Sequence, residues 1–197
     1  MQLVTPIIQH CKLFQPCKLQ LRRTVKSKFP IMTNTQTTII TVDDQQGDSL
    51  SVVGDTYRIM ISGKQTSGSY AIIDMLVPPG GGPGPHAHPN MQEAFFVADG
   101  EIEFKMEGGS YIAKKGSLVN IPLGGAVHSF KNITDSTAHM LCTVIPAGLD
   151  EFFREIGKPV EAGKFLPLHV PGVEELQGLK AIAEKYQQKL YPPNYLD

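Results

Sequence analysis

The chain has 197 residues, enough for one well-buried core with an extension but too few for two comfortable domains. Its net charge is −1, yet residues 43–197 alone carry 12 basic and 19 acidic side chains, a net charge of −7. This acidity argues against nucleic acid as a partner, because phosphate contacts need a basic face, and no apolar run approaches the roughly 20 residues of a membrane-spanning helix.

Residues 1–42 form a basic extension that contains no acidic residue and is rich in Gln and Thr. Such a composition is typical of an organellar transit peptide and equally of a disordered tail. A misassigned start is a third alternative, because Met32 opens a plausible initiating sequence. We expect no catalytic residue in this extension.

Cysteine usage gives no sign of a disulfide framework. The three cysteines, Cys11, Cys17 and Cys142, form no CxxC pair, and their number is odd. We therefore expect reduced thiols in a cytoplasmic protein.

Residues 43–148 are predicted to form a β-barrel, because short strand patterns alternate there with turn signals. The predicted strands are Thr56–Ser62, Ser69–Val77, Ala94–Ala98, Glu101–Met106, Ser110–Ala113, Ser117–Ile121, Val127–Lys131 and Ala138–Ile145. The Pro- and Gly-rich run at residues 78–85 predicts a loop. Asp99-Gly100 predicts a tight hairpin of type I′ between the strands on either side.

Side-chain alternation indicates which strand faces are buried. Ile102, Phe104 and Met106 alternate with charged residues, which predicts one buried and one solvated face. The last predicted strand is largely apolar on both faces, with Met140, Cys142 and Val144 on one and Leu141, Thr143 and Ile145 on the other. Such a strand needs cover on both sides, so we expect a homodimer.

After Pro146 the apolar period becomes helical, at Leu149–Ile156 and again at Val173–Leu190. We expect residues 149–197 to be a C-terminal helical extension packed on the barrel or on a partner subunit. The polar face of the second segment mixes Glu and Lys, which argues against membrane binding.

Four side chains are predicted to bind one metal ion. His86 and His88 share a face if the segment is extended, because strand side chains alternate. Glu93 lies at an odd separation from His88, but a bend at Pro89-Asn90 would return it to that face. His128 would enter from another strand, and His139 is the alternative to it.

The spacing Gly80-x5-His86-x-His88-x4-Glu93-x6-Gly100 resembles the first motif of the cupin superfamily. The second motif, Gly-x5-Pro-x-Gly-x2-His-x3-Asn, is matched with one extra residue in its turn, at Gly116, Pro122, Gly124 or Gly125, His128 and Asn132. The resemblance implies an all-β cupin double-stranded β-helix, or jelly-roll barrel, with C-terminal helices. It also implies one divalent transition metal, and these donor types suit Fe, Mn, Ni, Co, Cu or Zn.

Residues 146–157, and a later helix ending near Tyr191-Pro192-Pro193, look like the C-terminal extension of bacterial single-domain quercetinase-type cupins. That resemblance implies O2-dependent ring cleavage of a flavonol-like or other enolisable aromatic small molecule, in which Glu93 also accepts the substrate hydroxyl proton. The substrate pocket is then expected to be lined by Phe95, Val97, Phe104, Met106 and Phe130.

Two other functions stay open. A metal-dependent cupin isomerase or lyase would need a second acid/base group, for which Tyr57, Tyr111 and Lys105 are candidates. A non-catalytic cupin that binds a small molecule would use no oxygen.

Overall fold

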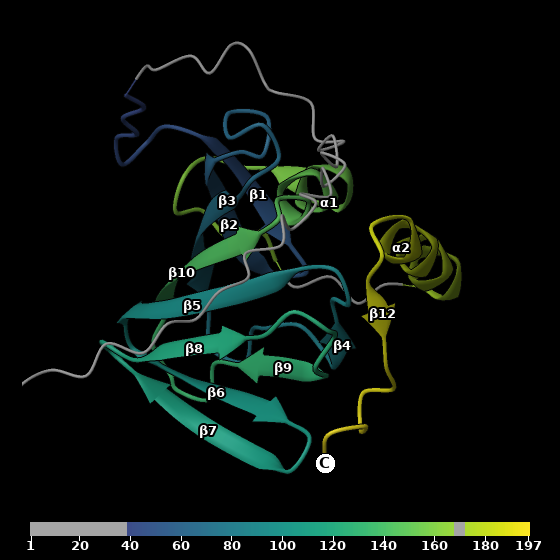
Figure 1. Ribbon diagram of the computed structural model, residues 1–197. Helices are drawn as coiled ribbons and strands as arrows, with labels where there is room; N and C mark the ends of the chain where they lie inside the picture. Colours follow the sequence, from purple (N-terminus) through teal and green to yellow (C-terminus); the bar gives the residue numbers. More distant parts are fainter. Residues whose placement is uncertain (1–38, 168–171) are drawn as a thin grey trace, which may run out of the picture. The chain divides into compact units, whose positions relative to one another are not determined.

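Twelve strands and two helices make up the part of the chain that the structure, a computed structural model, describes, residues 39–167 and 172–197 (Figure 1). The hypotheses for residues 1–38, with Cys11 and Cys17, lie outside this part. The strands are β1 (Asp48–Val52), β2 (Asp55–Ile61), β3 (Ala71–Val77), β4 (His86–Ala87), β5 (Gln92–Asp99), β6 (Glu101–Met106), β7 (Gly109–Lys114), β8 (Leu118–Ile121), β9 (His128–Lys131), β10 (Ala138–Ile145), β11 (Lys158–Pro159) and β12 (Lys189–Leu190).

The strands form two antiparallel sheets, which confirms the predicted all-β jelly-roll fold. One sheet has the order β11-β1-β2-β3-β10-β5-β8 and the other the order β12-β4-β9-β6-β7. All eight predicted strands are present to within a few residues, whereas β1, β4, β11 and β12 were not predicted. The last two belong to the predicted C-terminal extension, yet each adds a strand to a barrel sheet.

The predicted hairpin at Asp99-Gly100 is wrong. Strand β5 pairs with β10 and β8, while β6 pairs with β7 and β9, so the two residues connect one sheet to the other. Gly100 has a φ of 80°, and Asp99 is not in the left-handed region that a type I′ turn requires. By contrast, residues 62–70 do join two paired strands, β2 and β3.

The core lies between the two sheets and consists of inward-facing apolar side chains. Ile73, Met75, Phe95, Phe104 and Met140 are almost completely buried, and each contributes roughly 1.5–3 kcal/mol by leaving water. Strand β3 shows strict alternation of buried and half-buried residues, as expected for a strand with one face on the core. The expected buried face of β6 holds for Ile102 and Phe104 but fails at the strand end, where Met106 is 36% exposed.

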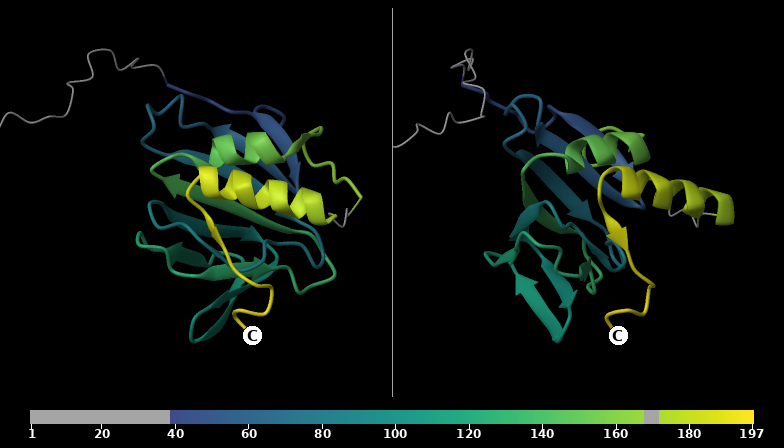
Figure 2. Two further views of the ribbon diagram at one scale, coloured as in Figure 1. Left: turned by 90° about the vertical axis from the view of Figure 1, so that its right-hand side faces the viewer. Right: turned by 45° about the vertical axis from the view of Figure 1, so that its right-hand side comes forward.

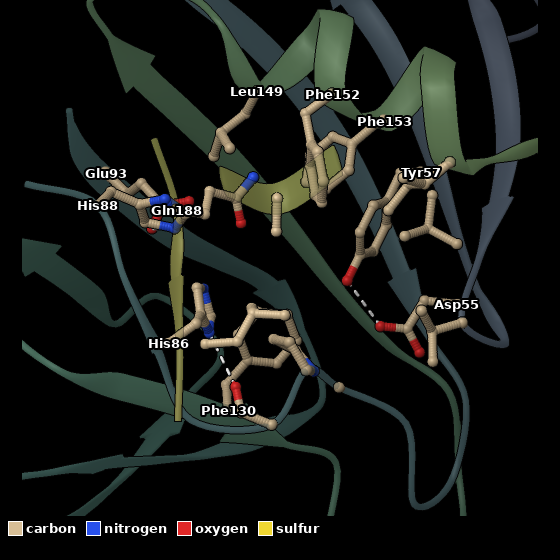
Figure 3. Close-up of a pocket in the computed structure, with 18 of the residues that line it drawn as sticks. Asp55, Tyr57, His86, His88, Glu93, Phe130, Leu149, Phe152, Phe153 and Gln188 are labelled. Carbon is tan, nitrogen blue, oxygen red and sulfur yellow. Dashed lines mark hydrogen bonds and ion pairs between the residues drawn. The ribbon is translucent and has the colours of Figure 1, made fainter. Parts of the chain in front are cut away.

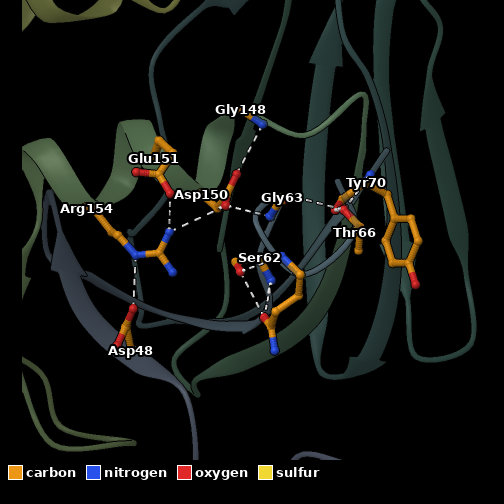
Figure 4. A network of polar contacts seen from close by, with 10 residues as sticks. Asp48, Ser62, Gly63, Thr66, Tyr70, Gly148, Asp150, Glu151 and Arg154 are labelled. Atoms are coloured by element: carbon orange, nitrogen blue, oxygen red, sulfur yellow. Dashed lines mark hydrogen bonds and ion pairs between the residues drawn. The ribbon is translucent and has the colours of Figure 1, made fainter. Parts of the chain in front are cut away.

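Helix α1 (Leu149–Ile156), at the bounds that the sequence predicts, packs Leu149, Phe152 and Phe153 against the seven-stranded sheet. Its position is fixed by Asp150, a buried carboxylate (Figure 4). The amide of Gly63, in the loop between β2 and β3, donates to Asp150 Oδ2 at 2.8 Å, and the Gly148 amide donates to Oδ1 at 3.1 Å. The buried carboxylate therefore joins the helix to a loop 87 residues earlier in the chain.

Helix α2 (Val173–Lys185) ends five residues before the predicted end at Leu190. At Gln187 the backbone has a φ of 60°, which turns the chain out of the helix and into β12. Figure 2 shows α2 beside α1 and the C-terminal segment running down along the five-stranded sheet. Neither helix has the length and apolar character that crossing a membrane requires, within the part of the chain that is described.

Candidate metal centre

The four predicted ligands come together at one end of the barrel. His86 lies in β4 opposite His128 at the start of β9, and Glu93 lies in β5. The chain turns at residues 89–91 between His88 and β5, as the sequence predicts, and Glu93 returns to the face of the histidines. One ligand atom from each of the four side chains lies within 4.8 Å of the others.

Two of the imidazoles are oriented by backbone carbonyls. His86 Nδ1 donates to the Gly84 carbonyl at 2.9 Å, and His128 Nδ1 donates to the Ala126 carbonyl at 2.9 Å. A ring nitrogen that donates to a carbonyl carries the proton, so each ring presents the Nε2 lone pair to the centre of the group. Outer hydrogen bonds of this kind are typical of metal-binding histidines.

The electrostatics favour the protonation states that bind a metal. Burial, together with the neighbouring His128 and His88, lowers the pKa of His86 to about 3, so its imidazole is neutral at neutral pH. Burial alone would raise the pKa of Glu93, but contacts with His128 and His88 outweigh it and lower that pKa, so the carboxylate is ionised. Glu93 Oε2 lies 3.1 Å from His128 Nε2 and 3.2 Å from His88 Nε2.

The donors fit a divalent transition metal. Ligand atoms bound at about 2.1 Å to one ion lie roughly 3–4 Å from one another, close to the spacing seen here. Both ring nitrogens of His88 are buried, and among the described residues Nδ1 has no hydrogen-bond partner while Nε2 has only the 3.2 Å contact with Glu93 Oε2. Buried polar groups are normally satisfied, so a metal ion that binds this imidazole together with Glu93 fits the site.

The loops that carry the ligands are held by Asn132, a fully buried side chain. Its Nδ2 donates to the carbonyls of Val77 and Ser136, each at 2.8 Å, and its Oδ1 accepts from the Thr134 amide at 2.9 Å. Its backbone bonds the Gly-rich run before His86: Gly80 N–H donates to the Asn132 carbonyl at 2.8 Å, and Asn132 N–H donates to the Gly81 carbonyl at 2.9 Å.

Two glycine sites allow close backbone approach near the ligands. A Cβ on Gly82, where φ is 123°, would lie 2.1 Å from the Phe130 carbonyl oxygen. Gly125, where φ is 83°, packs on Pro89 in the turn after His88. The extra residue of the second motif thus lies in a turn where Gly124 and Gly125 both have positive φ, and His128 keeps its place.

A cavity of about 260 Å³ opens beside the four ligands (Figure 3). His86, His88 and Glu93 form part of its wall. Most of the remaining wall is apolar, and it includes Phe95, Phe130, Leu149, Phe152 and Phe153. The site can therefore take a small ring compound that also reaches the four candidate ligands, His86, His88, Glu93 and His128, called the metal-binding group below.

The structure separates the five residues that were expected to line the pocket. Phe95 and Phe130 line the cavity. Val97 and Phe104 are buried in the core outside its wall, because they lie farther along their strands, and Met106 is exposed.

The alternative residues also receive definite places. His139, the fallback ligand, lies on the outer face of β10, where it contacts Asp74. Tyr57 lines the cavity and donates to Asp55 Oδ2 at 2.8 Å. Tyr111 is exposed, and Lys105 pairs with Asp197 at 2.6 Å, so neither reaches the cavity.

Sequence reasoning missed the polar residues that complete the cavity. Asp55 is buried at one end, and its pKa is raised to about 7 by burial, although Tyr57 and the Gly82 amide lower it. Gln188, also buried, and Tyr191 come from the C-terminal segment. Outside the cavity wall, the Cys142 thiol lies 3.8 Å from Glu93 Oε1. No local motif marks these residues; only the alternation in β2 places Asp55 on the face of Tyr57.

Comparisons with known proteins agree with this fold. Residues 73–144 match the family model described as Cupin domain. The quercetin 2,3-dioxygenase of Bacillus subtilis (strain 168) is 24% identical over 124 residues, 63% of this chain. That stretch is 36% of the enzyme's length, so the chain matches about a third of that relative.

A solved structure shares the fold. KdgF from Halomonas sp. superposes with a TM-score of 0.51 at 16% identity, covering 58% of this chain and 99% of that one. A protein described as a predicted oxalate decarboxylase from Thermotoga maritima superposes less closely, with a TM-score of 0.49 at 21% identity, covering 54% of this chain and 99% of that one. The chain is therefore similar to cupins: residues 73–144 match the cupin domain model, and a stretch of 124 residues is similar to quercetin 2,3-dioxygenase.

Proposed function

We propose that the chain is a metal-dependent dioxygenase that cleaves a flavonol-like or other enolisable aromatic ring with O2. The observation that carries the proposal is the position of the His86, His88, Glu93 and His128 group at the wall of a cavity with aromatic side chains. The partial similarity to a quercetin dioxygenase supports the same reaction class.

The residues of the site have distinct roles in this reaction. Three imidazoles and one carboxylate would hold the ion and leave one or two positions open. A divalent ion of Fe, Mn, Ni, Co, Cu or Zn bound there would lower the pKa of a coordinated substrate hydroxyl. Glu93 accepts that proton. Phe95, Phe130 and Phe152 hold the ring and exclude water.

Oxygen consumption tests the proposal. Metal-replete protein given a flavonol should consume O2 and bleach the near-ultraviolet absorbance of the flavonol, because ring cleavage breaks the conjugation. Glu93→Gln should lower kcat roughly 10²- to 10⁴-fold with a smaller effect on substrate affinity. Glutamine has nearly the same size as glutamate but cannot act as the base. Glu103→Gln, on strand β6, is the matched control. No oxygen uptake with any of the six metals over a panel of flavonols would exclude the reaction.

A second candidate function is that of a metal-dependent isomerase or lyase, which the Asp55–Tyr57 pair favours. This pair lies in the same cavity as the metal-binding group, and a carboxyl whose pKa is about 7 can both give and take a proton near neutral pH. In an isomerase Asp55→Asn would abolish turnover without any oxygen requirement. In a dioxygenase the same variant would retain oxygen uptake.

We further propose that the cupin forms a homodimer through the outer face of the seven-stranded sheet. Phe96 lies in register with Leu118 on β8 and with Leu141 on β10, so the three side chains share one face. Phe96 and Leu118 are exposed apolar side chains. A second copy of the chain would cover them, which is the cover that the sequence pattern of β10 requires.

A further inference from the structure

Gln188 is a buried polar side chain in the cavity wall that the cupin motifs do not contain. It is 5% exposed, and its Nε2 has no hydrogen-bond partner among the described residues. Figure 3 shows its carboxamide directed into the drawn pocket. A buried amide donor without a partner destabilises the folded protein, so an acceptor supplied by a ligand explains why it is there.

The backbone around Gln188 is fixed against the segment that carries His86 and His88. Strand β12 pairs with β4, with Leu190 opposite His86 and Lys189 opposite Ala87. The backbone N–H of Tyr191 donates to the Pro85 carbonyl at 3.0 Å, and the backbone N–H of Gln188 donates to the Ala183 carbonyl at 2.9 Å.

A side-chain contact fixes the other flank. Asn90, in the turn after His88, donates through Nδ2 to Gln187 Oε1. The segment is thus held by bonds on both sides of Gln188 that do not use the Gln188 carboxamide, which stays available to a ligand.

We propose that Gln188 is a substrate-binding residue whose Nε2 donates a hydrogen bond to a ligand oxygen next to the one bound at the metal-binding group. The ligand class is a small conjugated ring with two adjacent oxygens, such as a keto-enol pair. The inference rests on the proposed function only in requiring a ligand that reaches His86, His88 and Glu93.

The chemistry of the wall supports this ligand class. The aromatic walls formed by Phe95, Phe130 and Phe152 suit a flat apolar body. One oxygen of the ligand would bind at the metal-binding group, and the Gln188 Nε2 donor needs an acceptor next to that oxygen. The second oxygen of a keto-enol pair is such an acceptor, whereas a ring with one oxygen would leave Gln188 unpaired.

Anaerobic calorimetric titration of metal-replete protein tests the role of Gln188. The probes are 3-hydroxyflavone and tropolone, which carry adjacent oxygens, and azide, which can bind a metal through nitrogen and carries no oxygen. Gln188→Leu should weaken both ring probes about tenfold or more and leave azide binding unchanged. Gln177→Leu, at an exposed site on α2, should bind all three like the wild type.

The melting temperature of the unliganded protein separates binding from structure. Gln188→Leu should melt no lower than the wild type, because leucine fills similar space without an unpaired donor. A lower melting temperature with loss of azide binding would assign Gln188 a structural role and overturn the inference. So would ring-probe affinities within about twofold of the wild type, or failure of both ring probes to bind wild-type protein. Oxygen uptake is a separate readout, so a chain that binds the probes without consuming O2 would refute only the dioxygenase.

Discussion

At the scale of single residues, the site combines ionisable groups whose pKa values are shifted in opposite directions. Glu93 is kept ionised by the histidines around it, whereas Asp55 at another part of the wall has its pKa raised to about 7 by burial. The neighbours that face Asp55 are the Tyr57 hydroxyl from its own strand and the Gly82 amide from the loop before β4. Two carboxyl groups of one cavity therefore differ in protonation near neutral pH.

The raised pKa of Asp55 predicts a pH dependence of stability. Between the ordinary pKa of 3.8 and the folded value of about 7, the folded state binds more protons than the unfolded state. The contribution of Asp55 to the free energy of unfolding therefore falls as pH rises across that window, and above the window it no longer changes with pH. Relative to the wild type, Asp55→Asn should gain on the order of 4 kcal/mol between pH 4 and 8, at roughly 1.4 kcal/mol per pKa unit. Urea unfolding across that range measures the difference; a constant difference would contradict the shift.

On the outer face of the seven-stranded sheet, His139 of β10 forms a different titrating pair with Asp74 of β3, which Arg58 also contacts. The hydrogen bond to Asp74 raises the pKa of His139, although partial burial opposes it. His139→Gln should cost stability below the ordinary histidine pKa of 6.5, and this cost should disappear as pH rises through the raised value. Metal content should stay at the wild-type level, since this histidine faces away from the metal-binding group. A loss of metal would return His139 to the candidate ligands.

At the scale of elements, local sequence patterns predicted the strands in which apolar and polar side chains alternate clearly. They did not predict which strands pair when the partners are far apart in the sequence. The HxH spacing and the bend at Pro89-Asn90 predicted that His86, His88 and Glu93 share a face, because strand geometry sets those directions. His128 was predicted from the resemblance to the second cupin motif. Asp99-Gly100 has the sequence of a hairpin, but its flanking strands pair in different sheets. Gln188 could not be found, because only the pairing of β12 with β4 brings it to the cavity.

The buried anchor of helix α1 gives a prediction for this scale. Asp150→Ala would leave the Gly63 and Gly148 amides without their acceptor, so it should cost about 2–4 kcal/mol of unfolding free energy. Because Leu149 and Phe152 line the cavity, ligand affinity should fall as well. Glu151→Ala, an exposed neighbour on the same helix turn, is the control. Equal unfolding free energies for the two variants, measured in urea, would show that Asp150 does not hold the helix.

At the scale of the whole molecule, the barrel supplies the four candidate metal ligands, and the C-terminal segment supplies part of the cavity wall. Residues 149–197 were expected to pack as helices, yet they also contribute β11, β12, Gln188 and Tyr191. The sequence could place the helices, because their apolar stripes are local. It could not reveal which strand their flanks would join.

The proposed dimer is tested by light scattering at this scale. Wild-type protein should have the mass of two chains, and Phe96→Lys with Leu118→Lys should give one chain, since two charges would be buried at the contact. Leu123→Lys, an exposed leucine in the turn before β9, should stay dimeric. A monomeric wild type at micromolar concentration would refute the dimer.

The central claim is that His86, His88, Glu93 and His128 bind one metal ion, and elemental analysis of purified protein tests it most directly. The wild type should hold about one divalent transition metal ion per chain, and His86→Ala with His88→Ala should lose it while keeping the β-sheet circular dichroism spectrum. Full metal content in that double variant, or none in wild-type protein prepared with all six metals present, would contradict the account.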